Sequence, residues 1–335
     1  MRNTPSLADI RLRTSVLSLV VGSLVLLLKF YTYHLTNSVA ILSDALESVV
    51  NVVSAAFMIY AVKAAQEPPD DEHPYGHGKF EFVTAVFEGG LIIFASFMIA
   101  YEAISAMIHG SYAVHFGHGF ILVAIAGLAN GLLGLHLVNV GKKTASMALI
   151  ADGKHVLGDF LVFAGMMAAL TIVKYTGMQW LDPAIALLMA IILACTGLPV
   201  VKSAMNGLVD AADPKLLKNI LNALEEARVP GFIRAHKIRV MRNGRSIHVD
   251  GHLVVPQFWT VAQTHDFSDA LEKRLVSNHF LDSEFEFHID PCGRNYCKIC
   301  DLESCPIRAT PFVSRPPLQL SEIIGAVDIP NLPEP

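Results

Sequence analysis

Two apolar stretches of this sequence carry side chains of the kinds that bind metal ions, spaced as on one face of a helix. The members are Asp44, Glu47, Ser48 and Asn51 in residues 37–62, and Asp152, His155 and Asp159 in residues 145–173. Ionisable groups at membrane depth are costly and therefore face a partner or an aqueous path. Carboxylate, amide and imidazole groups facing one another across two helices would form a cation site inside a bilayer.

Polar side chains in membrane helices also join helices by hydrogen bonds. That explanation suffices for a lone Asn or Ser, but not for several ionisable residues in the interior of two apolar runs. The side-chain types suit a divalent first-row metal. Gly153, Gly158 and Gly165 in the second stretch permit close approach of a neighbouring helix. We therefore favour cation binding.

Two more groups of potential ligands lie outside the apolar runs. The loop of residues 68–81 contains Asp70, Asp71, Glu72, His73 and His77. The polar part of the chain contains His236, His248, His252, His265, His288 and Asp290. A solvated acidic loop explains the first group as well as a metal site does, and exposed histidines on a small domain are usually incidental.

Four of the five cysteines form a C-x4-C-x2-C-x4-C cluster at Cys292, Cys297, Cys300 and Cys305. The central pair has the spacing of zinc ligands, and four thiolates make a closed tetrahedral set. A redox C-x-x-C is the competing interpretation, but no thioredoxin-like strand and helix surround it. In a reducing compartment metal ligation is favoured over disulfides.

The elements that position these residues differ between the two parts of the chain. The mean hydropathy is +0.47 and only 16% of residues are charged. A bilayer crossing takes about 20 mostly apolar residues. We expect six spans, at approximately 13–35, 38–63, 82–108, 118–140, 145–174 and 180–202. The polar start and the long first apolar run argue against a signal peptide.

Charge patterning predicts the orientation and excludes one class of partner. Lys and Arg precede the first span and occupy every second loop, which places both termini in the cytoplasm. The net charge of −5 offers no basic surface for nucleic acid. The lipid bilayer is the expected partner of the apolar part.

After the last apolar run the sequence predicts a small open α/β sandwich of order α-β-β-α-β. The expected elements are a helix over 213–228, strands over 235–241 and 246–255, a helix over 260–276 and a strand over 284–290. The Pro-rich end has little to bury, so we expect it to be mobile or extended. The predicted parts are an N-terminus (1–12), a six-helix transmembrane domain (13–208), the α/β domain (209–291), the cysteine cluster (292–305) and the tail (306–335).

Four segments together resemble the cation diffusion facilitator family: NSVAILSDALESVVN, DDEHPYGHGKFE, ADGKHVLGD and HIDPC. The resemblance covers about residues 13–292. It implies six transmembrane helices and a cytoplasmic ferredoxin-like domain. It also implies a homodimeric secondary active transporter, not an enzyme, that exports divalent cations in exchange for protons across the bacterial inner (plasma) membrane.

The resemblance also implies roles for individual residues. Glu47, Asn51, His155 and Asp159 match the transport site; the spacing from Asn51 to His73 favours Glu47 and Asn51 over Asp44 and Ser48. Asp44 and Asp152 then belong to the ion path or support the ligands. The remaining implied groups are a loop site of Asp70, His73 and His77, a cytoplasmic cluster near the dimer interface of His236, His252, His265, His288 and Asp290, and an inter-domain charge pair of Lys79 and Asp210.

Asn51 departs from the family's zinc-type pattern, which has a carboxylate at this position. A neutral amide should hold a dication less tightly, so the metal stays open among Zn²⁺, Fe²⁺, Co²⁺ and Mn²⁺. Zn²⁺ and Fe²⁺ are favoured because His155 supplies an imidazole. Imidazole changes charge near cellular pH, which makes His155 the expected proton carrier.

Three other functions remain to be distinguished. A membrane-tethered metal sensor without transport would use the Cys/His domain as its main site. An intramembrane metallohydrolase would need a motif such as H-E-x-x-H, which the sequence lacks. A channel is disfavoured because buried ligand sets bind ions too firmly for fast conduction.

Overall fold

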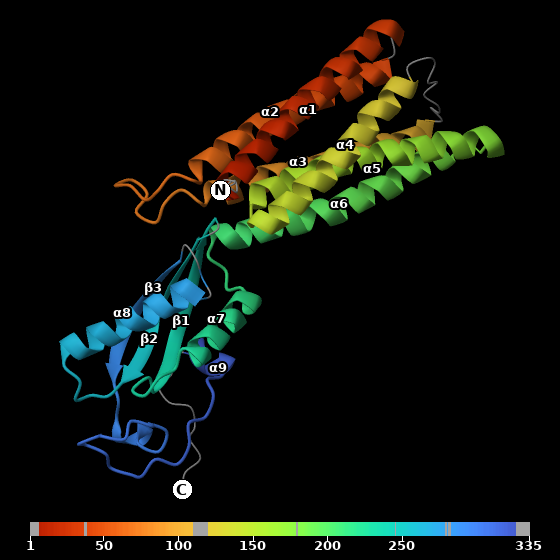
Figure 1. The fold of residues 1–335 in the computed structure, drawn as a ribbon. Helices are drawn as coiled ribbons and strands as arrows, with labels where there is room; N and C mark the ends of the chain where they lie inside the picture. The colour runs from red at the N-terminus through yellow and green to blue at the C-terminus, as the bar shows by residue number, and fades with distance from the viewer. Residues whose placement is uncertain are drawn as a thin grey trace. The chain divides into compact units, whose positions relative to one another are not determined.

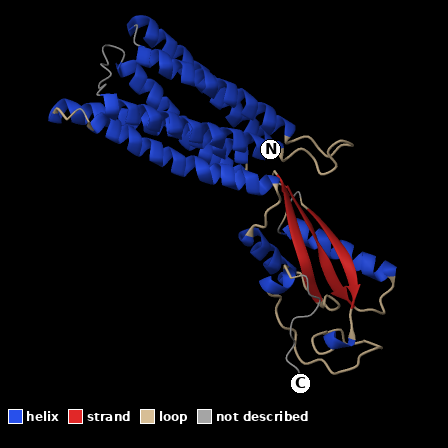
Figure 2. Ribbon diagram, turned by 180° about the vertical axis from the view of Figure 1, so that it is seen from behind, coloured by secondary structure: helices blue, strands red, loops and turns tan. Residues whose placement is uncertain are grey.

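The computed structural model describes residues 7–36, 39–109, 120–178, 180–244, 246–278, 280 and 283–325. The chain divides between Leu208 and Val209 into two compact units, and each is considered by itself. The first unit is helical and the second is a small α/β domain, which confirms the predicted fold class (Figure 1). Figure 2 shows the same division, with all strands in the C-terminal unit.

Six long helices make up the described part of the N-terminal unit. They are α1 (Leu7–Thr36), α2 (Val39–Ala64), α3 (Phe80–His109), α4 (Phe120–Thr144), α5 (Met147–Thr176) and α6 (Leu181–Leu208). Within the described residues, α1, α3, α4 and α6 are long and apolar enough to cross a membrane. The polar stripes of the sequence lie on the other two helices, α2 and α5.

Close helix contacts bring α5 against its neighbours. α4 packs along α5, α3 along α6 and α1 along α2, while α2 also contacts α5. A Cβ at Gly153 would lie 2.8 Å from both the Val138 backbone nitrogen and the Leu137 Cβ. The absence of a side chain at Gly153 therefore lets α4 and α5 approach each other, as the small residues of this stretch predict.

The C-terminal unit has the predicted α-β-β-α-β order. Its elements are α7 (Pro214–Glu226), β1 (Arg234–Asn243), β2 (Ser246–Val255), α8 (Val261–Asn278) and β3 (Glu284–Pro291), followed by a short 3-10 turn (Arg294–Tyr296) and α9 (Leu320–Ile323). β2 lies between β1, to which it is antiparallel, and β3, to which it is parallel. Asp213 caps α7 by accepting from the amides of Lys215 and Leu216, and Pro214 occupies the first turn.

The sequence predicts a tail that is mobile or extended and has little to bury. Residues 306–319 are without helix or strand, but the expectation that the tail buries little is wrong at Leu318 and Ile323. Both are buried among the side chains of the α/β core. The guanidinium groups of Arg228 and Arg234 each donate to the carbonyl of Pro316, at 3.0 and 3.1 Å. Arg234 also forms an ion pair with Glu322, with 3.0 Å between Nε and Oε1. Residues 326–335 of the predicted tail lie outside the described residues.

The tail escapes pattern analysis for a physical reason. Its two buried apolar residues, Leu318 and Ile323, follow a pair of prolines and lie five positions apart, which matches neither a helix nor a strand period. Proline removes a backbone donor but keeps its carbonyl acceptor, and two buried arginines use that acceptor. A segment without periodicity is thus fixed by contacts to distant residues.

Candidate metal sites

In the intramembrane candidate site, the side chain of Asn51 links two residues of the neighbouring helix. From α2, its amide Nδ2 donates to Asp159 Oδ2 on α5 at 2.5 Å, and its Oδ1 lies 2.8 Å from His155 Nε2. His155 is buried, while Asn51 and Asp159 are partly buried. The structure therefore brings together three of the four residues implied for the transport site, and one amide holds both of the others.

The direction of these hydrogen bonds assigns the protons. An amide oxygen only accepts, so His155 Nε2 carries the hydrogen that it gives to Asn51. An amide nitrogen only donates, so Asp159 Oδ2 is the acceptor in the other hydrogen bond. A metal ion bound by Nε2 would have to displace that proton, because only a ring nitrogen without hydrogen is a ligand. Metal binding at this nitrogen and protonation exclude each other.

Other polar residues of the two stripes have partners that separate them from this triad. Ser18 of α1 donates to Asp152 Oδ2 at 2.8 Å, and both residues are buried. Lys29 of α1 donates to Ser48 at 2.8 Å. The side chains of Asp44 and Glu47 lie outside the described residues, so their roles stay predictions. In the described structure Asp152 supports the helix packing beside the triad.

Glu88 of α3 is a buried carboxylate that the sequence analysis did not select. It is fully buried, and neither of its oxygens has a hydrogen bond of normal geometry within the described residues. Its carboxyl group lies near Ser54 of α2 and near Asp152 and Asp159 of α5. Two glutamates, Glu81 and Glu88, lie seven residues apart in the apolar run FEFVTAVFEGGLIIF and were the available signal. Glu88 was missed because no Asp, Asn or His accompanies it in that run.

A second set of polar residues connects helices of the N-terminal unit by hydrogen bonds. Arg11 of α1 donates to Glu81 Oε1 of α3 at 2.9 Å and also to the Thr144 carbonyl at the end of α4. Ser146 donates to the other oxygen of Glu81 at 2.6 Å. All four residues are buried. This network ties α1, α3 and the α4–α5 turn together.

The loop candidate site has ligand atoms of Asp70, His73 and His77 within 4.8 Å of one another. Its Asp70 side chain is oriented by the backbone, since Oδ1 accepts from the amides of His73 at 2.6 Å and Glu72 at 3.0 Å. The His73 amide is the main cause that lowers the pKa of Asp70. Asp70 and His73 are exposed whereas His77 is buried. Such a site would exchange ions with solvent readily.

The C-terminal unit places three histidines in one row across its sheet. His236 of β1 is opposite His252 of β2, which is opposite His288 of β3. Asp290 follows two residues after His288 and therefore shares its face. One carboxylate oxygen of Asp290, Oδ2, lies 3.2 Å from His236 Nε2 and 2.9 Å from His252 Nδ1. Ligand atoms of His236, His252 and Asp290 all lie within 4.8 Å of one another.

The remaining predicted residues fall outside this group. His265 is exposed on α8 and is not among the described ligand atoms that converge on Asp290. His248 lies 3.2 Å from Glu284 Oε2 on the neighbouring strand. Lys79 and Asp210 belong to different units, and their pairing stays a prediction.

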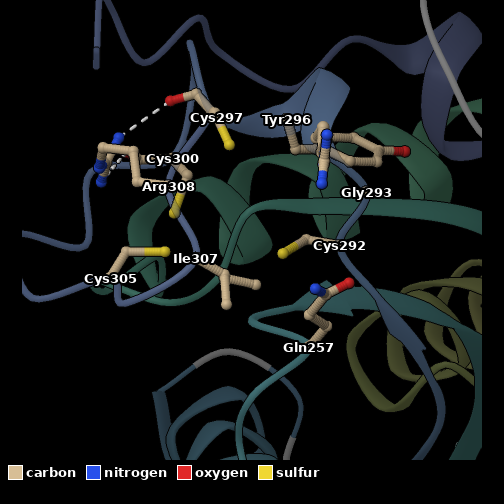
Figure 3. Close-up of a pocket in the computed structure, with 10 residues that line it drawn as sticks. Gln257, Cys292, Gly293, Tyr296, Cys297, Cys300, Cys305, Ile307 and Arg308 are labelled. Atoms are coloured by element: carbon tan, nitrogen blue, oxygen red, sulfur yellow. Dashed lines mark hydrogen bonds between the residues drawn. The ribbon is translucent and has the colours of Figure 1, made fainter. Parts of the chain in front are cut away.

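The four clustered cysteines are free thiols that line one cavity of about 250 Å³ (Figure 3). Burial raises the pKa of the Cys292 and Cys300 thiols above the usual value.

Comparison with known proteins relates both units to one kind of membrane protein. Residues 15–209 match the sequence family described as the cation efflux transmembrane domain. Residues 212–292 match the family described as the cytoplasmic domain of cation efflux proteins. The second match ends at Cys292, so the other three cysteines and the returning tail lie beyond it.

Individual relatives span the same region. An uncharacterised transporter of Synechocystis sp. is 32% identical over 278 residues, which cover 83% of this chain and 89% of the relative. Metal tolerance protein C1 of Arabidopsis thaliana is 29% identical over 82% of this chain and 62% of the relative. The cation-efflux pump FieF of Escherichia coli is 26% identical over 84% of this chain and 93% of the relative.

Proposed function

Because this chain belongs to the cation efflux family, it is a divalent metal cation transporter of a membrane, and we propose that it exports cytoplasmic Zn²⁺ or Fe²⁺ in exchange for protons as a homodimer. Co²⁺ and Mn²⁺ are secondary candidates. The proposed location is the inner (plasma) membrane, with both termini in the cytoplasm, as the distribution of Lys and Arg indicates.

The observation that carries the proposal is the bridge that Asn51 makes between His155 and Asp159. It places an imidazole, an amide and a carboxylate together on two helices, at a depth where each would be costly alone. When no ion is bound, the amide makes hydrogen bonds with both His155 and Asp159. A dication would replace these hydrogen bonds by binding the imidazole nitrogen, the carboxylate and the amide oxygen.

The proposed cycle is alternating access. A dication entering from the cytoplasm binds Asn51, His155, Asp159 and Glu47. His155 begins the cycle as the imidazolium, gives up its Nε2 proton to solvent and keeps its Nδ1 hydrogen. After the helices expose the site to the other side, the ion departs and the imidazole recaptures a proton. Because ion and proton compete for the same nitrogen, a pH gradient that is acidic outside favours release there.

We further propose that the His236, His252, His288 and Asp290 cluster, with His265, regulates transport. Its ligands come from strands whose pairing fixes their spacing. Ions bound there would draw two C-terminal domains together in the dimer and bias the membrane halves. The loop site of Asp70, His73 and His77 is proposed as a peripheral, rapidly exchanging site.

The test is metal-dependent proton flux in proteoliposomes that contain the purified full chain. Asp159→Ala should abolish flux because the site loses its described carboxylate. Thr171→Ala is the matched control, since Thr171 is exposed on the same helix and bonds only to the Met167 carbonyl of its own helix. Flux retained by Asp159→Ala would contradict the proposed transport site.

The same assay separates transport from a membrane-tethered sensor. If the protein is a sensor, the wild type should show no flux while its C-terminal unit still binds metal. A panel of Zn²⁺, Fe²⁺, Co²⁺ and Mn²⁺, measured with and without a pH gradient, identifies the transported ion. Rates independent of the pH gradient would contradict proton exchange.

A further inference from the structure

The cysteine cavity, lined by Cys292, Cys297, Cys300 and Cys305, has no part in the proposed transport cycle. Figure 3 shows the four sulfurs turned toward one common space. Cys292 directly follows β3, Cys297 directly follows the 3-10 turn, and the other two lie in the loop after it. A site with several ligands requires that all four cysteines face one cavity. Four incidental thiols would have no reason to do so.

Backbone amides are directed at three of these sulfurs. The amide of Ala309 donates to Cys297 Sγ at 3.4 Å. Amides of Gln257 and Leu302 donate to Cys292 and Cys300. A hydrogen bond to sulfur is worth most when the sulfur is an anion. These amides can stabilise thiolates once a bound cation offsets the burial of the sulfurs.

The loops that carry the cysteines are held from both sides. Arg308 lies beside the cavity and donates to the carbonyls of Cys297 at 3.0 Å, Cys300 at 3.2 Å and Leu302 at 2.5 Å. On the other side, Tyr296 and Ile299 are buried against Ile233 and Val254 of the α/β domain. The cavity is thus part of an organised module, and its guanidinium offsets negative charge.

We propose that Cys292, Cys297, Cys300 and Cys305 together bind one resident Zn²⁺ ion, which fastens the segment after β3 to the α/β domain. Zn²⁺ fits because it is borderline soft and takes four thiolates in tetrahedral geometry, whereas Mg²⁺ and Ca²⁺ prefer oxygen ligands. Each thiol loses its proton to solvent as its Zn–S bond forms. The inference does not depend on the proposed transport function.

Binding requires the cavity to contract. Among the described residues, no three of these sulfurs lie within 4.8 Å of one another. Tetrahedral Zn–S bonds of about 2.3 Å separate the sulfurs by about 3.8 Å. The loops that carry the cysteines must therefore move inward when the ion binds.

The experiment is a Co²⁺ titration of the reduced full chain in detergent, followed by absorbance. Thiolate ligands give Co²⁺ intense charge-transfer bands in the near ultraviolet, which imidazole and carboxylate sites do not give. We expect these bands in the wild type and in Cys195→Ser, whose cysteine lies outside the cluster. They should disappear when Zn²⁺ is added, and they should be absent in the Cys297→Ser/Cys300→Ser variant.

A second measurement keeps the test decisive if that variant does not fold. Alkylation of the wild type, mapped by mass spectrometry, should modify all five cysteines without metal but only Cys195 after Zn²⁺ is added. Absence of the bands in the reduced wild type, or equal alkylation with and without Zn²⁺, would overturn the proposal. So would iron with acid-labile sulfide in the purified protein, which would indicate an iron–sulfur cluster instead.

Discussion

The two units present similar ligands on different scaffolds, helices in one and strands in the other. In the N-terminal unit, Asn51 and the pair His155 and Asp159 lie on separate helices joined there only by side-chain hydrogen bonds. In the C-terminal unit, His236, His252 and His288 lie on strands whose backbones are hydrogen-bonded to one another. Helices can tilt apart without breaking backbone hydrogen bonds, whereas paired strands cannot.

This difference suggests why one site would carry ions and the other retain them. A helix-borne site can be disassembled by a small movement, which is a requirement for releasing cargo. A strand-borne site keeps its spacing because the register of the sheet sets it. The composition agrees, since the C-terminal row offers three imidazoles and the helix site offers one, together with a neutral amide.

The largest expected effect comes from making the same isosteric change in both units. Asp159→Asn should reduce transport to background, because it removes the charge that attracts the dication. Asp290→Asn should leave the maximal rate at saturating metal within about twofold, since it alters only the retained cluster. Proteoliposome flux at saturating metal measures both. Equal loss in the two variants would remove the distinction between cargo and retained sites.

The second prediction concerns the core that supports the strand-borne row. Ile323→Ala should lower the free energy of unfolding of the C-terminal unit by about 2–5 kcal/mol, because Ile323 is fully buried. Ile324→Ala, at an exposed neighbouring position, should change it by no more than about 0.5 kcal/mol. Urea unfolding followed by the fluorescence of Trp259, in a Trp180→Phe background, measures both. Similar small changes would mean that α9 does not contribute to this core.

The third prediction separates two histidines on one face of β2. His252→Ala should raise the metal concentration that gives half-maximal transport by about tenfold, as expected for loss of a ligand or its support. His248→Ala should leave it unchanged, because His248 pairs with Glu284 and lies outside the row. The measurement is flux against metal concentration. An unchanged curve for His252→Ala would dismiss a regulatory role for the row.

The smallest expected effect tests the neutral amide. Asn51→Asp should tighten binding of Zn²⁺ about threefold to tenfold, or roughly 1 kcal/mol, and slow release accordingly. The Asn51→Asp/Asp159→Asn double variant keeps one described carboxylate but moves it to α2, and it should recover part of the flux lost in Asp159→Asn. Competition with a zinc dye and flux assays report the two effects. Unaltered zinc affinity in Asn51→Asp would show that Asn51 is not a ligand.

Sequence patterns predicted the helical unit and the α-β-β-α-β order because both rest on hydrophobic periodicity. They also predicted that Asn51, His155 and Asp159 lie near one another, since helical spacing and motif resemblance agree there. They could not predict the Asn51 bridge, which depends on the distance and rotation between two helices. Glu88 was missed because its burial beside Asp152 and Asp159 arises only when α3 packs against α5.

The C-terminal tail contains core residues that sequence patterns did not predict. Leu318 and Ile323 belong to the α/β core, but no local pattern marks them as core residues. Arg228 and Arg234 lie roughly 80–90 residues earlier and hold this segment in place. Both donate to the Pro316 carbonyl, and Arg234 also pairs with Glu322. Such long-range contacts become visible only when the fold is known.

The return of α9 to the core also sets an order of events during synthesis. Every strand has been synthesised before Leu318 and Ile323 are made, yet the core that these two residues complete stays open until then. The helices of the N-terminal unit have by that time been available for membrane insertion. A nascent chain interrupted between Cys292 and Leu318 would therefore carry a finished set of helices beside an unsealed domain, and it would offer proteases an apolar surface that marks it as incomplete.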